Sequence, residues 1–360
     1  MIDFALPEEV ELLRATARSF AVDQLGPGLR RFESARAVSN EVVERFVQTG
    51  LAAVDWPEVL GGASLGALAR AVVLEELAAV DPGAALGLDP IGPALHPLRA
   101  HASEGELREL LAPLVGAPGS RAVLVGRPPA ELHLAGGRVR GTVPWVPSER
   151  VDLLVVLGPA EVWAIDAGIR CRPVRGSGLR AAGASEIELE DAPLRARFAG
   201  AGACRGALAR ARLDVAALLV GVMRGAADYS RAYALERVAF GRPIAHHQAL
   251  AFLIADMATA VDAARLLLLE AAWRVDAGED AVGAAAAALV EATEQALFVT
   301  PNAVQILGGH GFMLDHPVEK AMREARALSL LLGGVDAARE DAGRELLLCE
   351  RRAGRAEVTA

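Results

Sequence analysis

The sequence predicts an α+β protein of three domains: a helical N-terminal domain, a middle antiparallel β domain and a C-terminal helical bundle. Three observations support this. Apolar residues recur at helical spacing up to about residue 115, short apolar runs separated by Gly and Pro fill residues 120–200, and helical spacing returns from residue 206 onward. We expect the domains to span residues 1–117, 118–203 and 204–360.

Helices are expected in the first domain over residues 7–25, 39–50, 64–83 and 102–114. The first of them is apolar at every third or fourth position, at Val10, Leu13, Ala17 and Phe20. Ser39 and Ser64 stand where the second and third helices begin, and we interpret both as N-caps.

The middle part changes to strand patterns. Alternation is nearly strict over residues 185–190, which places Ile187 and Leu189 on one buried face. No long helical pattern separates the runs, so a doubly wound parallel sheet is disfavoured. Gly176-Ser177-Gly178 begins a match to a dinucleotide fingerprint, but a strand pattern follows it, so we interpret these glycines as turn formers.

Helical spacing then covers residues 206–238, 246–276, 279–307, 317–331 and 335–353. Glycine-rich joints separate these stretches, at residues 241–243, 278, 308–311 and 333–334. Long helices with short joints indicate a bundle.

Composition excludes several classes of protein. The 37 Lys+Arg and 46 Asp+Glu residues give a formal net charge of −9, which argues against nucleic acid or an anionic membrane as partner. Three cysteines without a C-x-x-C motif argue against a disulfide scaffold and a zinc site. We see no signal-peptide pattern and no apolar run long enough to cross a bilayer, so we expect a cytoplasmic protein.

Two segments of the bundle suit an anionic cofactor. Residues 236–248 place Arg237 at the end of one helix and Gln248 at the start of the next. Such an arginine can offer a planar pair of donors to a diphosphate, although a solvated arginine in an ordinary turn fits the pattern too. Residues 305–312 read Gln-Ile-Leu-Gly-Gly-His-Gly-Phe, whose glycines either let a ligand approach the backbone or simply end a helix.

Together these segments resemble the acyl-CoA dehydrogenase family, whose bundle carries R-x-x-F-G-x-P-I-x-x-x-Q and then Q-x-x-G-G-x-G-[FY] followed by [YH]-P-V-E-[RK]. Residues 138–156 and 178–194 look like strands of its middle domain, so the resemblance covers the whole chain. It implies a helical domain, an antiparallel β-barrel domain and a four-helix-bundle domain. It also implies an FAD cofactor and α,β-desaturation of an acyl-CoA thioester, with FAD as hydride acceptor.

The resemblance implies cofactor-binding residues as well, because FAD in this family is bound between subunits. Trp145 matches a tryptophan that packs against the isoalloxazine ring, with a role in the β-domain core as the alternative. The positions that would contact a neighbouring subunit's flavin are Arg237, Phe240, Gln248, Gln305, Gly308 and Gly309.

The catalytic base of the family has no counterpart here, and we assign no catalytic residue. A glutamate removes the α proton in relatives, and its position is Leu332 in this chain. Some branches place the base before an arginine on the first bundle helix, where this chain has Ala211. Asp214 lies one turn further on, but we interpret it as a solvated or arginine-paired helix charge.

Other positions near the reaction centre depart from the family pattern. Pro147 stands where Thr or Ser meets flavin N5, Arg127-Pro128-Pro129 shortens a flavin-contacting loop, and Gly334 and Asp336 replace Thr and Gln of a T-x-Q element. The departures gather at the reaction centre, whereas the outer cofactor contacts remain.

We therefore expect the base-less partner of a homologous subunit in a heterotetramer, similar to the paired, shortened subunits of actinobacterial sterol degradation. Electron-transfer flavoprotein is a further candidate partner. Two alternatives stay open: a flavin-free structural or regulatory homologue, and a homo-oligomeric flavoprotein of the same fold with different chemistry, such as oxygenation or elimination.

Overall fold

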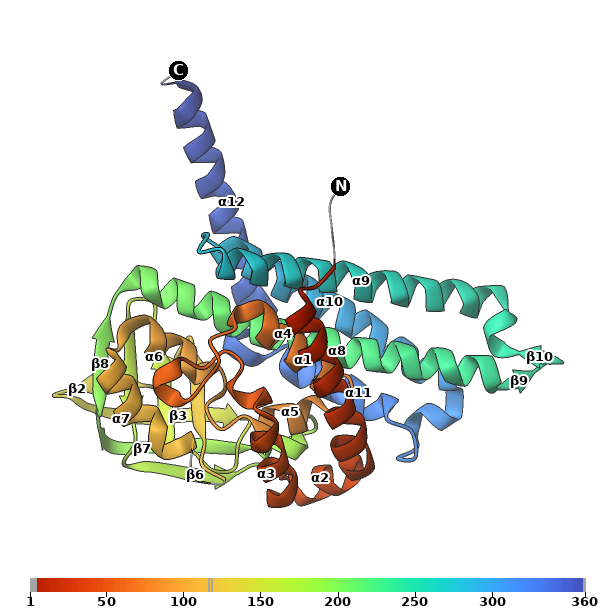
Figure 1. The fold of residues 1–360 in the computed structure, drawn as a ribbon, viewed down its shortest axis with the longest axis horizontal. Coiled ribbons are helices and arrows are strands. Elements are labelled where there is room, and N and C mark those ends of the chain that lie inside the picture. Colours follow the sequence, from red (N-terminus) through yellow and green to blue (C-terminus); the bar gives the residue numbers. More distant parts are fainter. Residues whose placement is uncertain (1–4, 116, 118, 359–360) are drawn as a thin grey trace.

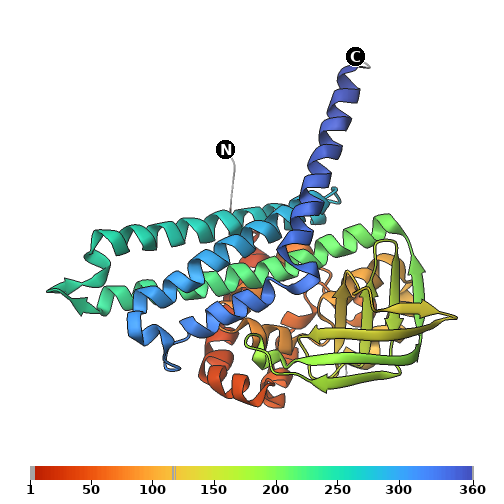
Figure 2. The same ribbon diagram turned by 180° about the vertical axis from the view of Figure 1, so that it is seen from behind.

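The computed structural model of the protein describes residues 5–115, 117 and 119–358, with side chains up to residue 347. Helices come first along the chain, then two small sheets, then long helices (Figure 1). The sheets lie at one end of the long axis of the molecule. The N-terminal helices cover the middle of the long C-terminal helices (Figures 1 and 2). The predicted α+β class and the order of its parts are confirmed.

The N-terminal helices are α1 (Glu8–Phe20), α2 (Leu29–Ala35), α3 (Asn40–Thr49), α4 (Gly66–Ala78), α5 (Pro82–Leu88), α6 (Leu95–His101) and α7 (Glu104–Val115). The helix expected over residues 64–83 is therefore two helices. Pro82 begins α5, and the carboxylate of Asp81 caps it by accepting a hydrogen bond from the backbone N of Ala84 at 3.1 Å.

Ser64 is not the N-cap of α4, because its hydroxyl donates to the carbonyl O of Trp56 instead. The cap comes from a distant part of the chain. Asp276 accepts hydrogen bonds from the backbone N of Ala67 at 2.7 Å and of Leu68 at 2.9 Å. A tertiary contact thus replaces the local one.

The only lysine of the chain, Lys320, ties α5 to α11 (Val318–Leu328). Its Nζ lies 2.7 Å from Oδ1 of Asp81 and also contacts Glu324, and all three side chains are buried. Glu324 accepts a hydrogen bond from the backbone N of Gly83 at 2.8 Å. Burial raises the pKa of Glu324 to about 7, although Lys320 opposes the shift.

The middle strands are β1 (Ala122–Gly126), β2 (His133–Ala135), β3 (Arg138–Val146), β4 (Leu153–Leu157), β5 (Glu161–Ile165), β6 (Ile169–Pro173), β7 (Ser185–Pro193) and β8 (Ala196–Ala199). They form two sheets, β1-β4-β5-β8 and β2-β3-β7-β6. Gly176 and Gly178 lie in the connection between β6 and β7, which agrees with their interpretation as turn formers.

Two details of the expected antiparallel barrel are wrong. The sheets do not close on each other, and β1 pairs in parallel with β4, with Ala122 opposite Leu153. The parallel pair arises because the chain leaves the first sheet after β1 and forms β2 and β3 in the second before β4 returns beside β1.

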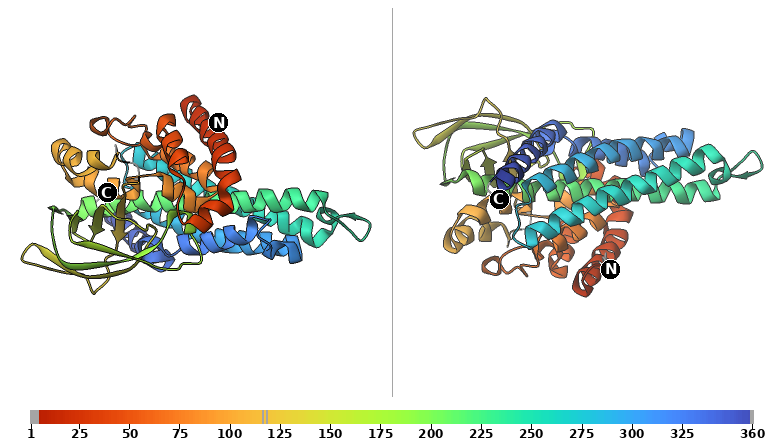
Figure 3. Two further views of the ribbon diagram at one scale, coloured as in Figure 1. Left: turned by 90° about the horizontal axis from the view of Figure 1, so that it is seen from below. Right: turned by 90° about the horizontal axis from the view of Figure 1, so that it is seen from above.

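The C-terminal helices are α8 (Ala201–Glu236), α9 (Gln248–Asp276), α10 (Val282–Leu307), α11 and α12 (Gly334–Val358). The short strands β9 (Val238–Ala239) and β10 (Arg242–Pro243) join α8 to α9 at the opposite end of the molecule from the sheets, and α12 points away from the body (Figures 1 and 3). Residues 282–312 are apolar and long enough to cross a membrane, but α10 packs between other helices of the bundle, as a core helix does.

The close approach of α8 to the end of α4 depends on Gly225. A Cβ built on Gly225 would lie 2.0 Å from the carbonyl O of Ala79, which is a backbone atom and cannot rotate away. On the same helix, a Cβ on Gly206 would meet no atom within 4 Å.

We predict that Gly225→Ala lowers the free energy of unfolding by about 1–3 kcal/mol, because the methyl group forces the two helices apart. Gly206→Ala should be neutral or stabilise the protein by up to about 1 kcal/mol through helix propensity. Urea unfolding of both variants checks this. Equal effects of the two substitutions would contradict the packing described.

Candidate functional site

Three of the predicted reaction-centre positions line one small cavity. Leu332, Pro147 and Asp214 all line a cavity of about 80 Å³ between the N-terminal helices, β1 and α8, called here the reaction-centre cavity. Two arginines, Arg70 and Arg121, line it as well. Positions that lie far apart in the sequence are therefore brought together, around a small cavity whose lining is mostly apolar.

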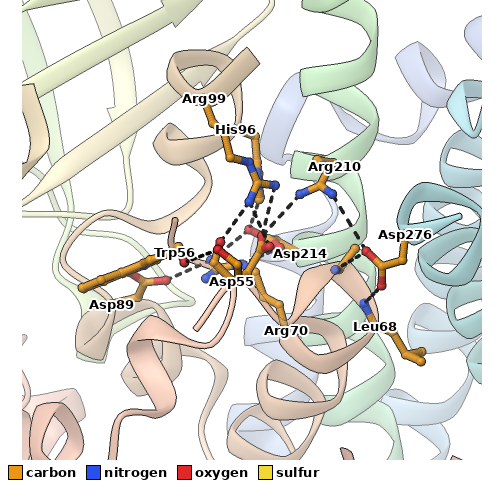
Figure 4. A network of polar contacts seen from close by, with 12 residues as sticks. Asp55, Trp56, Leu68, Arg70, Asp89, His96, Arg99, Arg210, Asp214 and Asp276 are labelled. Carbon is orange, nitrogen blue, oxygen red and sulfur yellow. Dashed lines mark hydrogen bonds and ion pairs between the residues drawn. The ribbon is translucent and has the colours of Figure 1, made fainter. Parts of the chain in front are cut away.

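A buried ion cluster forms one wall of this cavity (Figure 4). Arg70 of α4 pairs with both carboxylate oxygens of Asp214 on α8, through Nε at 2.9 Å and Nη2 at 3.0 Å. Nη2 also lies 2.9 Å from Oδ2 of Asp89, and Nε2 of His96 lies 3.0 Å from Oδ2 of Asp214. None of the four side chains is more than 9% exposed.

Asp214 is therefore no catalytic base. Burial would raise the pKa of Asp214, but the charge of Arg70 and the contact with His96 outweigh it and hold the pKa at about 2. The carboxylate is ionised at neutral pH, and both oxygens are engaged. The arginine-paired reading of Asp214 agrees with this geometry.

Sequence reasoning missed Arg70, Asp89 and His96. A signal was present, because Arg70 lies within the largely apolar stretch of residues 66–78, where a charged residue needs a buried partner. The partner could not be read from the sequence, since Asp214 is 144 positions away.

The ion cluster continues toward the ends of other helices (Figure 4). Asp55, itself 1% exposed, pairs with Arg99 at 2.9 Å and with Arg210 at 3.5 Å. Arg210 reaches Asp276, the residue that caps α4, at 3.9 Å. Charged contacts thus connect α4, α6, α8 and α9 on one side of the reaction-centre cavity.

Leu332, which the family resemblance aligns with the catalytic glutamate, also lines the cavity. Leu332 is buried in a left-handed conformation, with φ 56° and ψ 29°. It lies so close to the end of β1 that a Cβ on Gly126 would be 2.9 Å from its Cδ2. Leu332 is thus one of the apolar side chains that line the cavity.

The carboxylate of Asp341 binds arginines from two neighbouring elements. Asp341 of α12 accepts from Arg127, which follows β1, at 2.8 Å and from Arg212 of α8 at 2.5 Å. Ala211, the second base position, is buried and offers no ionisable group. Arg127, directly after β1, is therefore held against α12.

The predicted flavin contacts lie in two separate places. Arg237, Gly308 and Gly309 line an open groove of about 480 Å³ at the end of the bundle, called here the clamp groove. Gln248 and Gln305 are exposed near it, and no other described residue forms a hydrogen bond or ion pair with the side chains of Arg237, Gln248 or Gln305. All three are free to bind a molecule from outside.

Phe240 and Trp145 belong to strand regions that lie far apart in the molecule. Phe240 forms the turn between β9 and β10 beside the clamp groove and is 96% exposed. Trp145 lies on β3, partly buried against the main core. Because β3 is far from β9 along the long axis, one chain cannot place both around the same flavin (Figure 1).

The chain combines a helical domain, two small sheets and a bundle of long helices with an open groove at its end. Residues 7–117 match the N-terminal domain of acyl-CoA dehydrogenases, and residues 199–347 match their C-terminal domain. The chain therefore belongs to the acyl-CoA dehydrogenase family, whose members are oxidoreductases with FAD as cofactor.

Full-length relatives agree with this assignment. The chain is 30% identical to the probable acyl-CoA dehydrogenase FadE25 of Mycobacterium tuberculosis, over 92% of this chain and 93% of that protein. It is also 30% identical to cyclohex-1-ene-1-carbonyl-CoA dehydrogenase of Geobacter metallireducens, over 95% and 99%.

Solved structures share the fold over nearly the whole chain. Butyryl-CoA dehydrogenase from Megasphaera elsdenii superposes with a TM-score of 0.85 at 23% identity, covering 96% of this chain and 100% of that one. The Tcur3481-Tcur3483 steroid ACAD superposes with a TM-score of 0.83 at 26% identity, covering 96% and 99%.

FAD fits only one of the two regions. The clamp groove is open and offers unpaired donors, which suits a diphosphate and an adenosine. The reaction-centre cavity of about 80 Å³ is too small for a three-ring isoalloxazine, and Pro147 has no N–H or hydroxyl to donate to it.

We predict that Asp214→Asn lowers the free energy of unfolding at pH 7 by about 2–4 kcal/mol, because it leaves a buried Arg70 with one carboxylate fewer. The pKa of Asp214 is lower in the folded state, so its stabilisation is complete above about pH 4 and is lost in the wild type as the pH falls toward 2. Urea unfolding at several pH values checks both statements.

Asp228→Asn is the matched control, because Asp228 lies on the same helix in an exposed pair with Arg231. It should change stability by less than about 0.5 kcal/mol. A small effect of Asp214→Asn, like that of the control, would contradict the role of the buried cluster.

Proposed function

We propose that this chain is the base-less subunit of a heteromeric acyl-CoA dehydrogenase. Its clamp groove completes the FAD site of a homologous subunit, and that subunit supplies the glutamate and the pocket for the flavin ring and the acyl group. One contrast within the chain supports this proposal. The reaction-centre cavity is small, whereas the clamp groove is open and its Arg237 side chain has no partner among the described residues.

The side chains near the clamp groove suit the diphosphate and nucleotide parts of FAD. Arg237 offers a planar guanidinium to a diphosphate, and the amides of Gln248 and Gln305 can each donate and accept toward a nucleotide. Gly308 has a φ of 58°, which turns the chain at the end of α10 without a side chain in the groove. When bound, FAD supplies the hydride acceptor of the complex.

Exposed apolar side chains along the bundle favour a partner there. On α9 these are Phe252, Leu266, Leu267 and Trp273, each at least 41% exposed, and Phe312 and Leu314 follow α10. Large apolar residues gathered on one helical surface are typical of subunit interfaces. We propose that residues 206–353 form this interface in a dimer of dimers in the cytoplasm, with electron-transfer flavoprotein as a further partner.

One observation favours an alternative, the structural or regulatory homologue without flavin. The small volume of the reaction-centre cavity would equally suit a chain that has lost catalytic activity altogether. FAD binding at the clamp groove separates the two proposals, because only the first requires it.

We predict that the purified chain alone does not reduce an electron-accepting dye with any acyl-CoA. Without a base at Leu332 or Ala211, the rate should fall by at least about 10²–10⁴-fold relative to glutamate-bearing relatives. Activity should appear when the chain is purified together with a homologous subunit that carries the glutamate. Strong dye reduction by the homo-oligomer would overturn the proposal.

We predict that Arg237→Ala weakens FAD binding about ten- to a hundredfold, because a charge-assisted contact to the diphosphate is lost. Stability without FAD should stay within about 0.5 kcal/mol, since the side chain is exposed. Titration of the flavin-free complex with FAD measures the effect. Arg231→Ala is the control, because Arg231 is an exposed arginine of the same helix that pairs with Asp228. Equal FAD affinities of wild type and Arg237→Ala would remove the main support for the flavin role.

A further inference from the structure

A second, larger cavity lies between the N-terminal helices and the sheets. Its volume is about 500 Å³, within the range of small-molecule sites. It is distinct from the clamp groove, and its apolar walls come from α3, α5 and the end of α7, with Val43, Val47, Leu88, Leu114 and Ala181 among them. We call it the inter-domain cleft.

Arg121 is the charged group of this cleft that has no acidic partner. Three arginines line the cleft, but Arg36 lies 3.4 Å from Glu149 and Arg150 lies 2.6 Å from Asp152. Within residues 5–115, 117 and 119–347, no carboxylate oxygen comes within 4 Å of the Arg121 guanidinium. Its one hydrogen bond runs from Nη1 to the carbonyl O of Asp89, at 2.5 Å.

The backbone of Arg121 is held firmly at this place. Its N donates to Oδ2 of Asp152 at 2.9 Å, and its carbonyl O accepts from the backbone N of Asp152 and of Leu153 at 2.9 and 3.1 Å. The residue lies directly before β1, so the guanidinium extends from a fixed strand end. A ligand would therefore meet a pre-positioned cation.

The charge of Arg121 is only partly compensated. Burial lowers the pKa of Arg121, and the nearest carboxylates, Asp89 and Asp152, oppose this from a distance. Both are engaged elsewhere: Asp89 binds Arg70 and two backbone N–H groups, and Asp152 binds Arg150. A half-buried guanidinium without a carboxylate partner among the described residues favours an added anion.

The rim of the cleft restricts the kind of anion. Glu44 and Glu149 line it and are exposed, so they repel a ligand with more than one negative charge. The apolar walls exclude a purely polar ion from most of the volume. A single carboxylate on an apolar body satisfies both conditions.

We propose that the inter-domain cleft binds a small organic monocarboxylate, whose carboxylate pairs with Arg121 and whose apolar body packs against α3 and α5. Arg121 and Ser148 line the reaction-centre cavity as well, so the ligand occupies the outer side of a wall that the two cavities share. The site needs neither FAD nor a second subunit, and it stands independently of the proposed function.

Calorimetric titration of the purified full chain with octanoate tests the proposal, with 1-octanol as the uncharged control ligand. We expect one octanoate per chain and binding at least tenfold tighter than that of octanol. Arg121→Met keeps the aliphatic stem and should weaken octanoate binding ten- to a hundredfold. Arg150→Met removes a cleft arginine that already has a partner and should change it less than threefold.

A second variant tests the location without touching the arginine. Val47→Trp fills the cleft from α3, where Val47 is already 47% exposed, and should abolish binding of both ligands. If Arg121→Met does not fold, two results still test the proposal: the ratio of octanoate to octanol affinity in the wild type, and the loss of binding in Val47→Trp. Arg237→Ala should leave octanoate binding unchanged, which keeps this test separate from that of the flavin role.

Three results would overturn the proposal. The first is no octanoate binding by the wild type at millimolar concentration, and the second is equal affinity for octanoate and octanol. The third is unchanged octanoate binding in folded Arg121→Met or in Val47→Trp.

Discussion

The structure depends on one buried guanidinium, that of Arg70. A lone cation in an apolar interior is strongly unfavourable, so its position dictates where carboxylates must be. Asp214 and Asp89 meet that demand from α8 and from the residue after α5. The three elements are thereby fixed to one another, and the rest of the N-terminal half is arranged around them.

The same cluster affects which ligands the middle of the molecule can bind. The lining of the reaction-centre cavity contains the paired charges of Arg70, Asp89 and Asp214 as well as Leu332, and the cavity holds only about 80 Å³. A cavity of this volume is too small for a flavin ring. Ligand-binding capacity lies instead at the ends of elements, in the clamp groove and in the inter-domain cleft.

The sequence was sufficient for features that local chemistry controls. Gly50 ends α3 in a left-handed conformation, and the change from helical to strand spacing marks the three parts of the fold. Contacts between distant residues were out of reach, since periodicity does not identify partners. Asp276 as the cap of α4, the parallel β1–β4 pair and the Arg70 cluster all belong to this group. The roles of Arg237 and Gln248 stay predictions, because the flavin they would contact belongs to another subunit.

The buried contacts of Lys320 have a chemical consequence for the surface of the protein. Acyl thioesters are acyl donors, and a neutral lysine amine attacks them readily. The one lysine of this chain is 2% exposed, and its Nζ is held by Asp81 and Glu324, which raise its pKa against the effect of burial. No lysine side chain is thus presented to thioesters in solution. The protein is intrinsically resistant to spontaneous lysine acylation, and reagents that target lysine amines will not report on its folded surface.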